Sequence, residues 1–193
     1  VSGLHVTFSP MVDLVRDPRW GRVMESTGED PLLNSRLAAA MVRGYQGENL
    51  KEDNWRVAAC VKHFAAYGGA LAGRDYNTVD MSERQLREMY LPGYKAGLDA
   101  GAKLVMTSFN TVDGVPATGN QWLFRDVLRN EFGFEGVVIS DWGAIKELIP
   151  HGVAKDEKQA AELAIKAGVD IEMMTTCYPD YLKELLEEGR IAE

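Results

Sequence analysis

Five short apolar runs, in which hydrophobic residues do not alternate with polar ones, constrain the fold of this chain most. Each run has about the length of a strand, and segments with helical periodicity separate the runs. Strands that are apolar on both faces are typical of parallel sheets, which helices cover and connect. The pattern therefore predicts an α/β protein. The predicted strands are residues 5–12, 56–64, 102–110, 136–141 and 169–174, and the predicted helices are residues 31–47, 81–101, 120–133, 156–168 and 178–190.

Two parallel architectures compete for this pattern, an open doubly wound sheet and a closed (β/α)8 barrel. No strand is followed by the glycine fingerprint of a dinucleotide site, and GGALAGR (68–74) lacks the ending of a phosphate loop. Five strand–helix units are too few to close a barrel of eight strands. The sheet is therefore either open or an incomplete portion of a TIM-like barrel.

Local signals refine the helix boundaries. Ser82 is a suitable N-cap for the helix at 81–101, and Pro92 is expected to kink or split that helix. Gly133 is expected to end the helix that precedes it.

Composition excludes several classes of partner. The chain has 193 residues, enough for one domain, and a net charge of −8 without a cluster of Lys and Arg. This argues against nucleic acid and anionic membrane surfaces as partners, and no apolar run is long enough to span a bilayer. The opening VSGLHVTFSP is too short and too polar for a signal peptide, which favours a cytoplasmic over an exported protein. Neither a metal site nor a cofactor is expected, and Cys60 is predicted to be a core residue.

Polar and aromatic side chains gather where the predicted strands end. Lys62 and His63 end the second strand, Arg74 follows in the next loop, and Asp141 and Trp142 end the fourth strand. The carboxyl ends of parallel strands meet at one edge of a sheet, where such proteins place their chemistry. Cations that bind hydroxyl groups, an aromatic face and one carboxylate suit a sugar, and the cations would keep the carboxylate ionised as a nucleophile. The pattern therefore favours a glycoside as the substrate.

Each of these residues also has a simpler interpretation. Asp141 alone is an ordinary loop or capping residue, Lys62 and His63 suit a buried ion pair with a loop carboxylate, and Lys62 also suits the Schiff base of an aldolase-type barrel. Asp13 and Asp17 lie close enough to a strand end for a functional role to stay open, although turn chemistry is enough to explain them. Arg19 and Arg22 are expected to pair with acids such as Glu25, Trp20 to serve in packing, and Met106 to fill the core.

Four long segments resemble the N-terminal barrel domain of glycoside hydrolase family 3, on its branch of bacterial β-glucosidases and β-xylosidases. They are FSPMVDLVRDPRWGRVMESTGEDP (8–31), CVKHFAAYGGALAGRDYNTVDMS (60–82), VMTSFNTVDGVPATGN (105–120) and GFEGVVISDWGAIKEL (133–148). The resemblance implies a retaining exo-acting β-glycosidase, with a β-D-glucosidase first, and identifies residues 1–193 as the central and C-terminal part of the barrel domain. An earlier barrel segment and a following α/β sandwich domain, which holds the general acid/base, would lie outside it.

The resemblance also implies site residues. Asp141 corresponds to the family's nucleophile, and Trp142 to a residue lining the −1 sugar subsite. Residues implied to contact or border the sugar are Arg22, Lys62, His63, Arg74 and Met106. The implied partners are β-glucosides or short β-linked oligosaccharides and the rest of the same enzyme, and a homodimer stays open. The β-N-acetylglucosaminidase branch is disfavoured, because the loop at 65–80 holds no His.

Three alternatives stay open at this point. The chain is a β-xylosidase of the same family, a sugar-binding fragment without turnover, or an unrelated barrel enzyme that uses Lys62.

Overall fold

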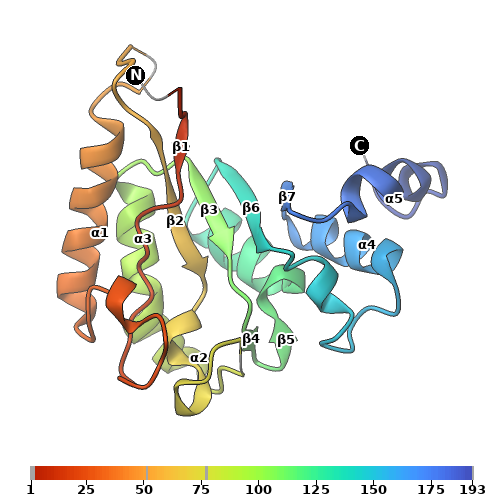
Figure 1. Cartoon of the computed structure of the whole chain (residues 1–193), viewed down its shortest axis with the longest axis horizontal. Helices are drawn as coiled ribbons and strands as arrows, with labels where there is room; N and C mark the ends of the chain where they lie inside the picture. The colour runs from red at the N-terminus through yellow and green to blue at the C-terminus, as the bar shows by residue number, and fades with distance from the viewer. Residues whose placement is uncertain (1–2, 51, 77, 193) are drawn as a thin grey trace.

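A five-stranded parallel sheet with the strand order β1-β2-β3-β6-β7 organises the computed structural model, which describes residues 3–50, 52–76 and 78–192 (Figure 1). Within these residues β1 pairs only with β2, and β7 only with β6, so the sheet is open at both edges. The predicted α/β class is confirmed. The strands are β1 Val6–Thr7, β2 Ala58–Phe64, β3 Leu104–Thr107, β6 Val137–Trp142 and β7 Ile171–Met173.

Helices follow the strands in the predicted order. Figure 1 shows α1 and α3 side by side near β2, and α4 and α5 together beyond β7. Among the described residues no helix has both the length and the apolar character needed to cross a bilayer. The longer helices are α1 Pro31–Gln46, α3 Leu91–Asp99, η6 Trp122–Glu131, α4 Glu157–Ala167 and α5 Cys177–Glu187. The shorter ones are η1 Val23–Glu25, η2 Tyr67–Gly69, η3 Leu71–Gly73, α2 Glu83–Gln85, η4 Leu86–Tyr90, η5 Ala117–Gly119 and η7 Lys146–Leu148.

The helix predicted at 81–101 is interrupted, as Pro92 implied. The Ser82 side chain caps its start by accepting from the Gln85 N–H, and a π-helical stretch, η4, comes immediately before α3. Pro92 has no N–H to donate to the preceding turn, so the regular α-helical ladder is broken there. Gly133 adopts a φ of 67° just after η6 and ends that helix, as expected.

A β-hairpin, β4 Thr111–Val112 and β5 Val115–Pro116, was not among the predicted elements. Its turn residues Asp113 and Gly114 both have positive φ, 51° and 76°. An Asp-Gly pair is a strong signal for such a turn, but two-residue strands leave no periodic pattern to accompany it.

The two faces of the sheet are covered differently. Ala59, Val61, Val105 and Val138 face the helices and belong to the main core. The alternate residues form a separate apolar cluster that, within the described part of the chain, contains no helix residue: Cys60, Met106 and Ile139, with Leu104 and Met173 at its margin. A doubly wound sheet carries helices on both faces, whereas a barrel carries them only outside. The one-sided cover therefore favours the barrel portion.

The first strand is shorter than predicted, but the segment that follows it positions Asp13. The ladder with β2 lapses near Pro10, which has no N–H to donate. It resumes around Met11, where the Pro10 carbonyl accepts the Lys62 N–H over 3.1 Å and the Val12 N–H donates to the Lys62 carbonyl over 2.7 Å. The latter bond carries Asp13, the next residue, to the carboxyl end of β2.

Close packing between α1 and α3 gives a testable consequence for stability. A Cβ added at Gly93 would lie 2.2 Å from Oδ1 of Asn34, and that buried side chain is held by its bond to the Val12 carbonyl. We expect Gly93→Ala to lower the free energy of unfolding by about 1–3 kcal/mol, because Asn34 must give up that bond or the helices must separate. Thermal unfolding measures the change.

Gly44→Ala is the matched control, since a Cβ at Gly44 in α1 meets no atom within 4 Å. That variant should gain about 0.5–1 kcal/mol from the lower chain entropy of Ala. Equal effects of the two substitutions would contradict the close approach of the helices.

Candidate active site

Asp141 lies at the carboxyl end of β6 with one oxygen left unbonded. Its N–H donates to Oγ1 of Thr107 on β3 over 3.2 Å, and its Oδ1 accepts the Trp142 N–H over 2.6 Å. Its Oδ2 has no hydrogen bond among the described residues, although the side chain is only 11% exposed. A buried carboxylate oxygen without a donor is costly, so this atom is one that a ligand or a reaction would use.

His63, at the end of β2, is the basic side chain that faces Asp141. Its Nε2 lies 3.5 Å from Oδ2 of Asp141, which is too long for a good hydrogen bond. Its Nδ1 lies 2.7 Å from Oδ2 of Asp13, and its backbone N–H donates to the same oxygen over 3.1 Å. The imidazole is therefore held from behind by Asp13 and points its other nitrogen at Asp141.

Arg22 and Lys62 meet at Glu25 rather than at Asp141. Arg22 forms a two-point pair with Glu25, with Nε and a terminal nitrogen 2.7 and 2.8 Å from the two carboxylate oxygens. The Nζ of Lys62 lies 3.9 Å from Oε2 of the same carboxylate. The bonds from Arg22 hold the pKa of Glu25 below its usual range in spite of partial burial. Both cations are thus arranged side by side by one acid.

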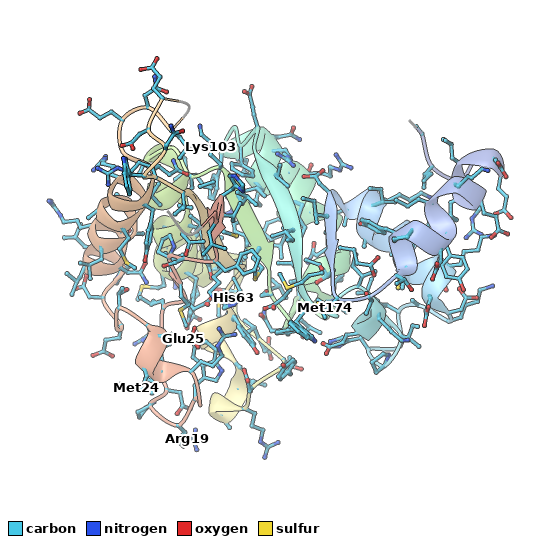
Figure 2. The ribbon with its side chains drawn as sticks, turned by 45° about the horizontal axis from the view of Figure 1, so that its top comes forward. Arg19, Met24, Glu25, His63, Lys103 and Met174 are labelled. Carbon is cyan, nitrogen blue, oxygen red and sulfur yellow. The ribbon has the colours of Figure 1, made fainter. Side chains whose placement is uncertain are left out.

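This group lies at one end of the sheet. Figure 2 shows His63 and Glu25 toward one end of the strands, and Lys103, at the start of β3, toward the other. Met24 and Arg19 lie beyond Glu25 in the same view. The carboxyl-end placement inferred from the strand pattern is therefore what the structure shows for these residues.

The remaining site residues predicted from the sequence are Trp142, Met106 and Arg74. Trp142 is 62% exposed at the end of β6 and is free to offer an indole face. Met106 is buried in the apolar cluster with Cys60 and Ile139, one strand away from Asp141. Arg74 is exposed after η3, and among the described residues its guanidinium has no hydrogen bond or ion pair, so the structure does not bring it into contact with Asp141.

Aromatic side chains pack beside His63. The ring of Tyr67 lies edge-on to His63 at 5.3 Å and to Trp20 at 5.0 Å, and Tyr76 packs on Phe109 at 4.3 Å. Trp20 is buried, as expected of a packing residue, but its Nε1 also donates to Oδ1 of Asp75 over 2.9 Å. These rings exclude water from one side of the imidazole, which strengthens the electrostatic interactions there.

Glu147 adds a second carboxylate on the Asp141 side. Burial raises the pKa of Glu147, and the charge of Asp141 raises it further. Burial also raises the pKa of Tyr76, and the charges of Glu147, Asp75 and Asp141 add to that effect. Neither residue was singled out from the sequence, although Glu147 lies in η7, in the segment directly after β6, whereas only the tertiary fold brings Tyr76 near the strand end.

The turn interpretation of Asp13 was wrong. Its carboxylate is fully buried and binds His63 and Tyr94, which lie far away in the sequence. The same interpretation holds for Asp17, which accepts from the N–H and the guanidinium of Arg19, and these bonds lower its pKa to about 2. The position of Asp13 close to a strand end, which left a functional role open, was the signal that applied.

Cys60 is a core residue, as predicted. It is fully buried, and burial raises its pKa to about 12, which keeps the thiol neutral and unreactive. Among the described residues no group of three or more His, Cys, Asp or Glu side chains has the geometry to hold a metal ion.

Comparison with known proteins decides the family. The model of the glycosyl hydrolase family 3 N terminal domain matches residues 1–193. The chain belongs to this family. The glycosyl hydrolase family 3 membership excludes the alternative of an unrelated aldolase-type barrel.

Relatives of this family 3 chain carry glycosidase names. A periplasmic β-glucosidase of Salmonella typhimurium is 51% identical over 98% of the chain, and a β-xylosidase of Formosa agariphila is 41% identical over 89%. The crystal structure of a β-glucosidase from Listeria innocua in complex with glucose is 66% identical over 98% of the chain, with a TM-score of 0.97. The chain covers 25%, 24% and 26% of these three proteins, so it spans about a quarter of their length.

The fold neighbours also complete the assignment of the architecture. The backbone of the Listeria innocua β-glucosidase follows the same course as this chain over 98% of its residues, as the TM-score of 0.97 indicates. The α/β fold with a portion of a TIM-like barrel is therefore confirmed.

Proposed function

We propose that this chain supplies the nucleophile and most of the sugar-binding side chains of a retaining, exo-acting β-glycosidase, with terminal β-D-glucosyl residues as its substrate. The observation that carries the proposal is the unbonded Oδ2 of Asp141, buried at the carboxyl end of β6 and faced by His63. Residues 1–193 then form the central and C-terminal part of the family's barrel domain, and the partners are β-glucosides or short β-linked oligosaccharides.

The proposed reaction has two steps. The Oδ2 of Asp141 attacks C1 of the sugar, the bond from C1 to the leaving oxygen breaks, and a carboxylic acid gives that oxygen its proton. Water then attacks C1 of the glycosyl-enzyme, the same acid group now accepts the proton, and Asp141 is released as a carboxylate. We assign the acid/base to no residue of this chain.

The other predicted residues have roles that their positions support. Arg22 and Lys62 offer nitrogen donors to ring hydroxyls, His63 presents its Nε2 to them, and the exposed Trp142 offers an indole face for the apolar side of a pyranose. Arg74 and Met106 are proposed to border the same subsite, as the family resemblance implies.

Glucosides rank above xylosides because the relatives with the highest identity given above are named β-glucosidases. The β-xylosidase of Formosa agariphila keeps xylosides as the second candidate. Rates of hydrolysis of p-nitrophenyl β-D-glucoside and β-D-xyloside by the complete gene product separate the two. We expect kcat/KM to be at least about tenfold higher for the glucoside, because its extra hydroxymethyl group makes contacts that a xyloside lacks.

A preference for the xyloside would favour the second candidate. Binding of glucose without hydrolysis of either substrate would favour a sugar-binding role without turnover and would count against the proposal.

A further inference from the structure

Asp13 and Tyr94 form a buried polar group behind His63 that the proposed reaction does not use directly. Both side chains are fully buried, and Tyr94 belongs to α3 on the outer face of the sheet. The Tyr94 hydroxyl lies 2.6 Å from Oδ1 of Asp13 and 2.7 Å from the His63 carbonyl, and it accepts the Ala66 N–H over 3.2 Å. The Tyr94 hydroxyl therefore links the Asp13 carboxylate to the backbone at His63 and at Ala66.

The carboxylate of Asp13 divides its two oxygens between these partners. Its Oδ1 faces Tyr94, and its Oδ2 accepts from the backbone N–H and the Nδ1 of His63. A carboxylate is an acceptor only, so the contact of 2.7 Å places a proton on Nδ1. The other ring nitrogen, Nε2, is then the atom presented to Asp141 and to a bound sugar.

Burial makes this arrangement rigid. Phe64 packs edge-on against the Tyr94 ring at 5.3 Å, and Tyr67 packs edge-on against His63 at 5.3 Å. Both oxygens of Asp13 have a partner within hydrogen-bond distance, so turning this side chain would leave a buried donor or acceptor unpaired. Asp13 and Tyr94 are both fully buried, and in the part of the chain that the structure describes neither has a hydrogen bond to Asp141, so we expect their effect on catalysis to pass through His63.

From this geometry we infer that Asp13 and Tyr94 are positioning residues, which hold the His63 imidazole with its proton on Nδ1 and its Nε2 at the sugar. The inference rests on the proposed function, because it gives His63 a sugar to contact. It assigns no chemical step to Asp13 or Tyr94.

The backbone N–H of His63 provides a sharp distinction between two substitutions at position 13. In Asp13→Asn, that N–H requires an acceptor, so the amide oxygen takes the place of Oδ2 and the amide nitrogen faces Tyr94. The imidazole then keeps its partner. In Asp13→Ala, both the orientation and the Nδ1 partner are lost.

Kinetics of the complete gene product on an aryl β-glucoside test the inference. We expect Asp13→Ala to lower kcat/KM about 100-fold, mainly through kcat, and Asp13→Asn to stay within about tenfold of the parent. Tyr94→Phe should lower kcat/KM about tenfold, because it frees Oδ1 of Asp13. Tyr90→Phe, at the end of η4, is the matched control and should leave kcat/KM unchanged, since among the described residues the buried Tyr90 has no hydrogen bond to Asp13 or His63.

A double-mutant cycle excludes a merely structural role. If Asp13 acts through the imidazole, Asp13→Ala has almost no further effect on kcat/KM once His63 is Ala. Independent, multiplying losses would overturn the inference. A lower kcat/KM in His63→Ala alone supports the proposed function, whereas the positioning role is tested by comparing Asp13→Ala with the double variant.

The tautomer gives a readout that needs no substrate. Nitrogen-15 NMR of histidine-labelled protein should show His63, identified by its loss in His63→Ala, with the proton on Nδ1. That signature should persist in Asp13→Asn and disappear in Asp13→Ala. A proton on Nε2 alone in the parent protein would overturn the inference even if the enzyme proved inactive on glucosides.

Discussion

Replacing Asp141 by Asn is expected to lower kcat for an aryl β-glucoside by on the order of 10⁴–10⁶-fold. The amide cannot form the ester with C1 that the proposed first step requires. The fold should be unaffected or slightly more stable, because Oδ2 of Asp141 is buried without a hydrogen bond and its charge is costly in the free protein. Steady-state kinetics and thermal unfolding of the complete gene product measure both effects.

Asp126→Asn is the matched control for this substitution. Asp126 is an exposed carboxylate on η6, and its one side-chain hydrogen bond within the described residues is a long contact of 3.5 Å from Asn130. The control should keep the parent kcat and unfolding midpoint. If Asp141→Asn retained more than a few per cent of the parent turnover, Asp141 would not be the nucleophile.

Replacing Lys62 by Met is expected to lower kcat/KM about 100-fold, with most of the loss in kcat. The Lys62 side chain is 15% exposed and points to the same carboxylate as Arg22. Contacts to sugar hydroxyls tighten as the ring flattens toward the transition state, so losing a donor raises the barrier more than it weakens substrate binding. The measurement is kcat and KM for the same aryl glucoside.

Lys103→Met makes the corresponding change at the opposite end of the sheet (Figure 2). Lys103 is exposed, so this variant should match the parent enzyme in both constants. A loss in Lys62→Met that appeared only as a raised KM, with kcat unchanged, would contradict the selective role in the transition state.

The class and order of the fold were predictable because the signals are local. Each strand is a continuous apolar run. Successive residues of a strand face opposite sides of the sheet, but the sequence does not show this alternation, because both sides are apolar. The hairpin at Thr111–Pro116 and the π-helical stretches of η4 and η6 were not predictable in the same way. The strands of the hairpin have two residues each, and a π-helical stretch has nearly the periodicity of an α-helix, so neither leaves a distinct periodic signature.

The site was predictable where a strand ends directly on a functional side chain. Asp141 and His63 follow that rule, and the structure places them 3.5 Å apart. The role of Glu25 as the shared acid of Arg22 and Lys62 was only half visible, since the sequence suggests the Arg22 pair but not the approach of Lys62. The bond between Asp13 and Tyr94 joins residues 81 positions apart, and no local pattern reports such a contact.

The trapped glycosyl-enzyme is the most direct test of the nucleophile. The complete gene product would be incubated with 2,4-dinitrophenyl 2-deoxy-2-fluoro-β-D-glucoside, whose good leaving group needs no acid and whose fluorine slows release of the sugar. Mass spectrometry of the intact protein and of its proteolytic peptides would then locate the label. We predict one fluoroglucosyl group per chain, attached to Asp141, whereas a label on another residue, or an enzyme that turns over glucosides without ever being labelled, would contradict the account.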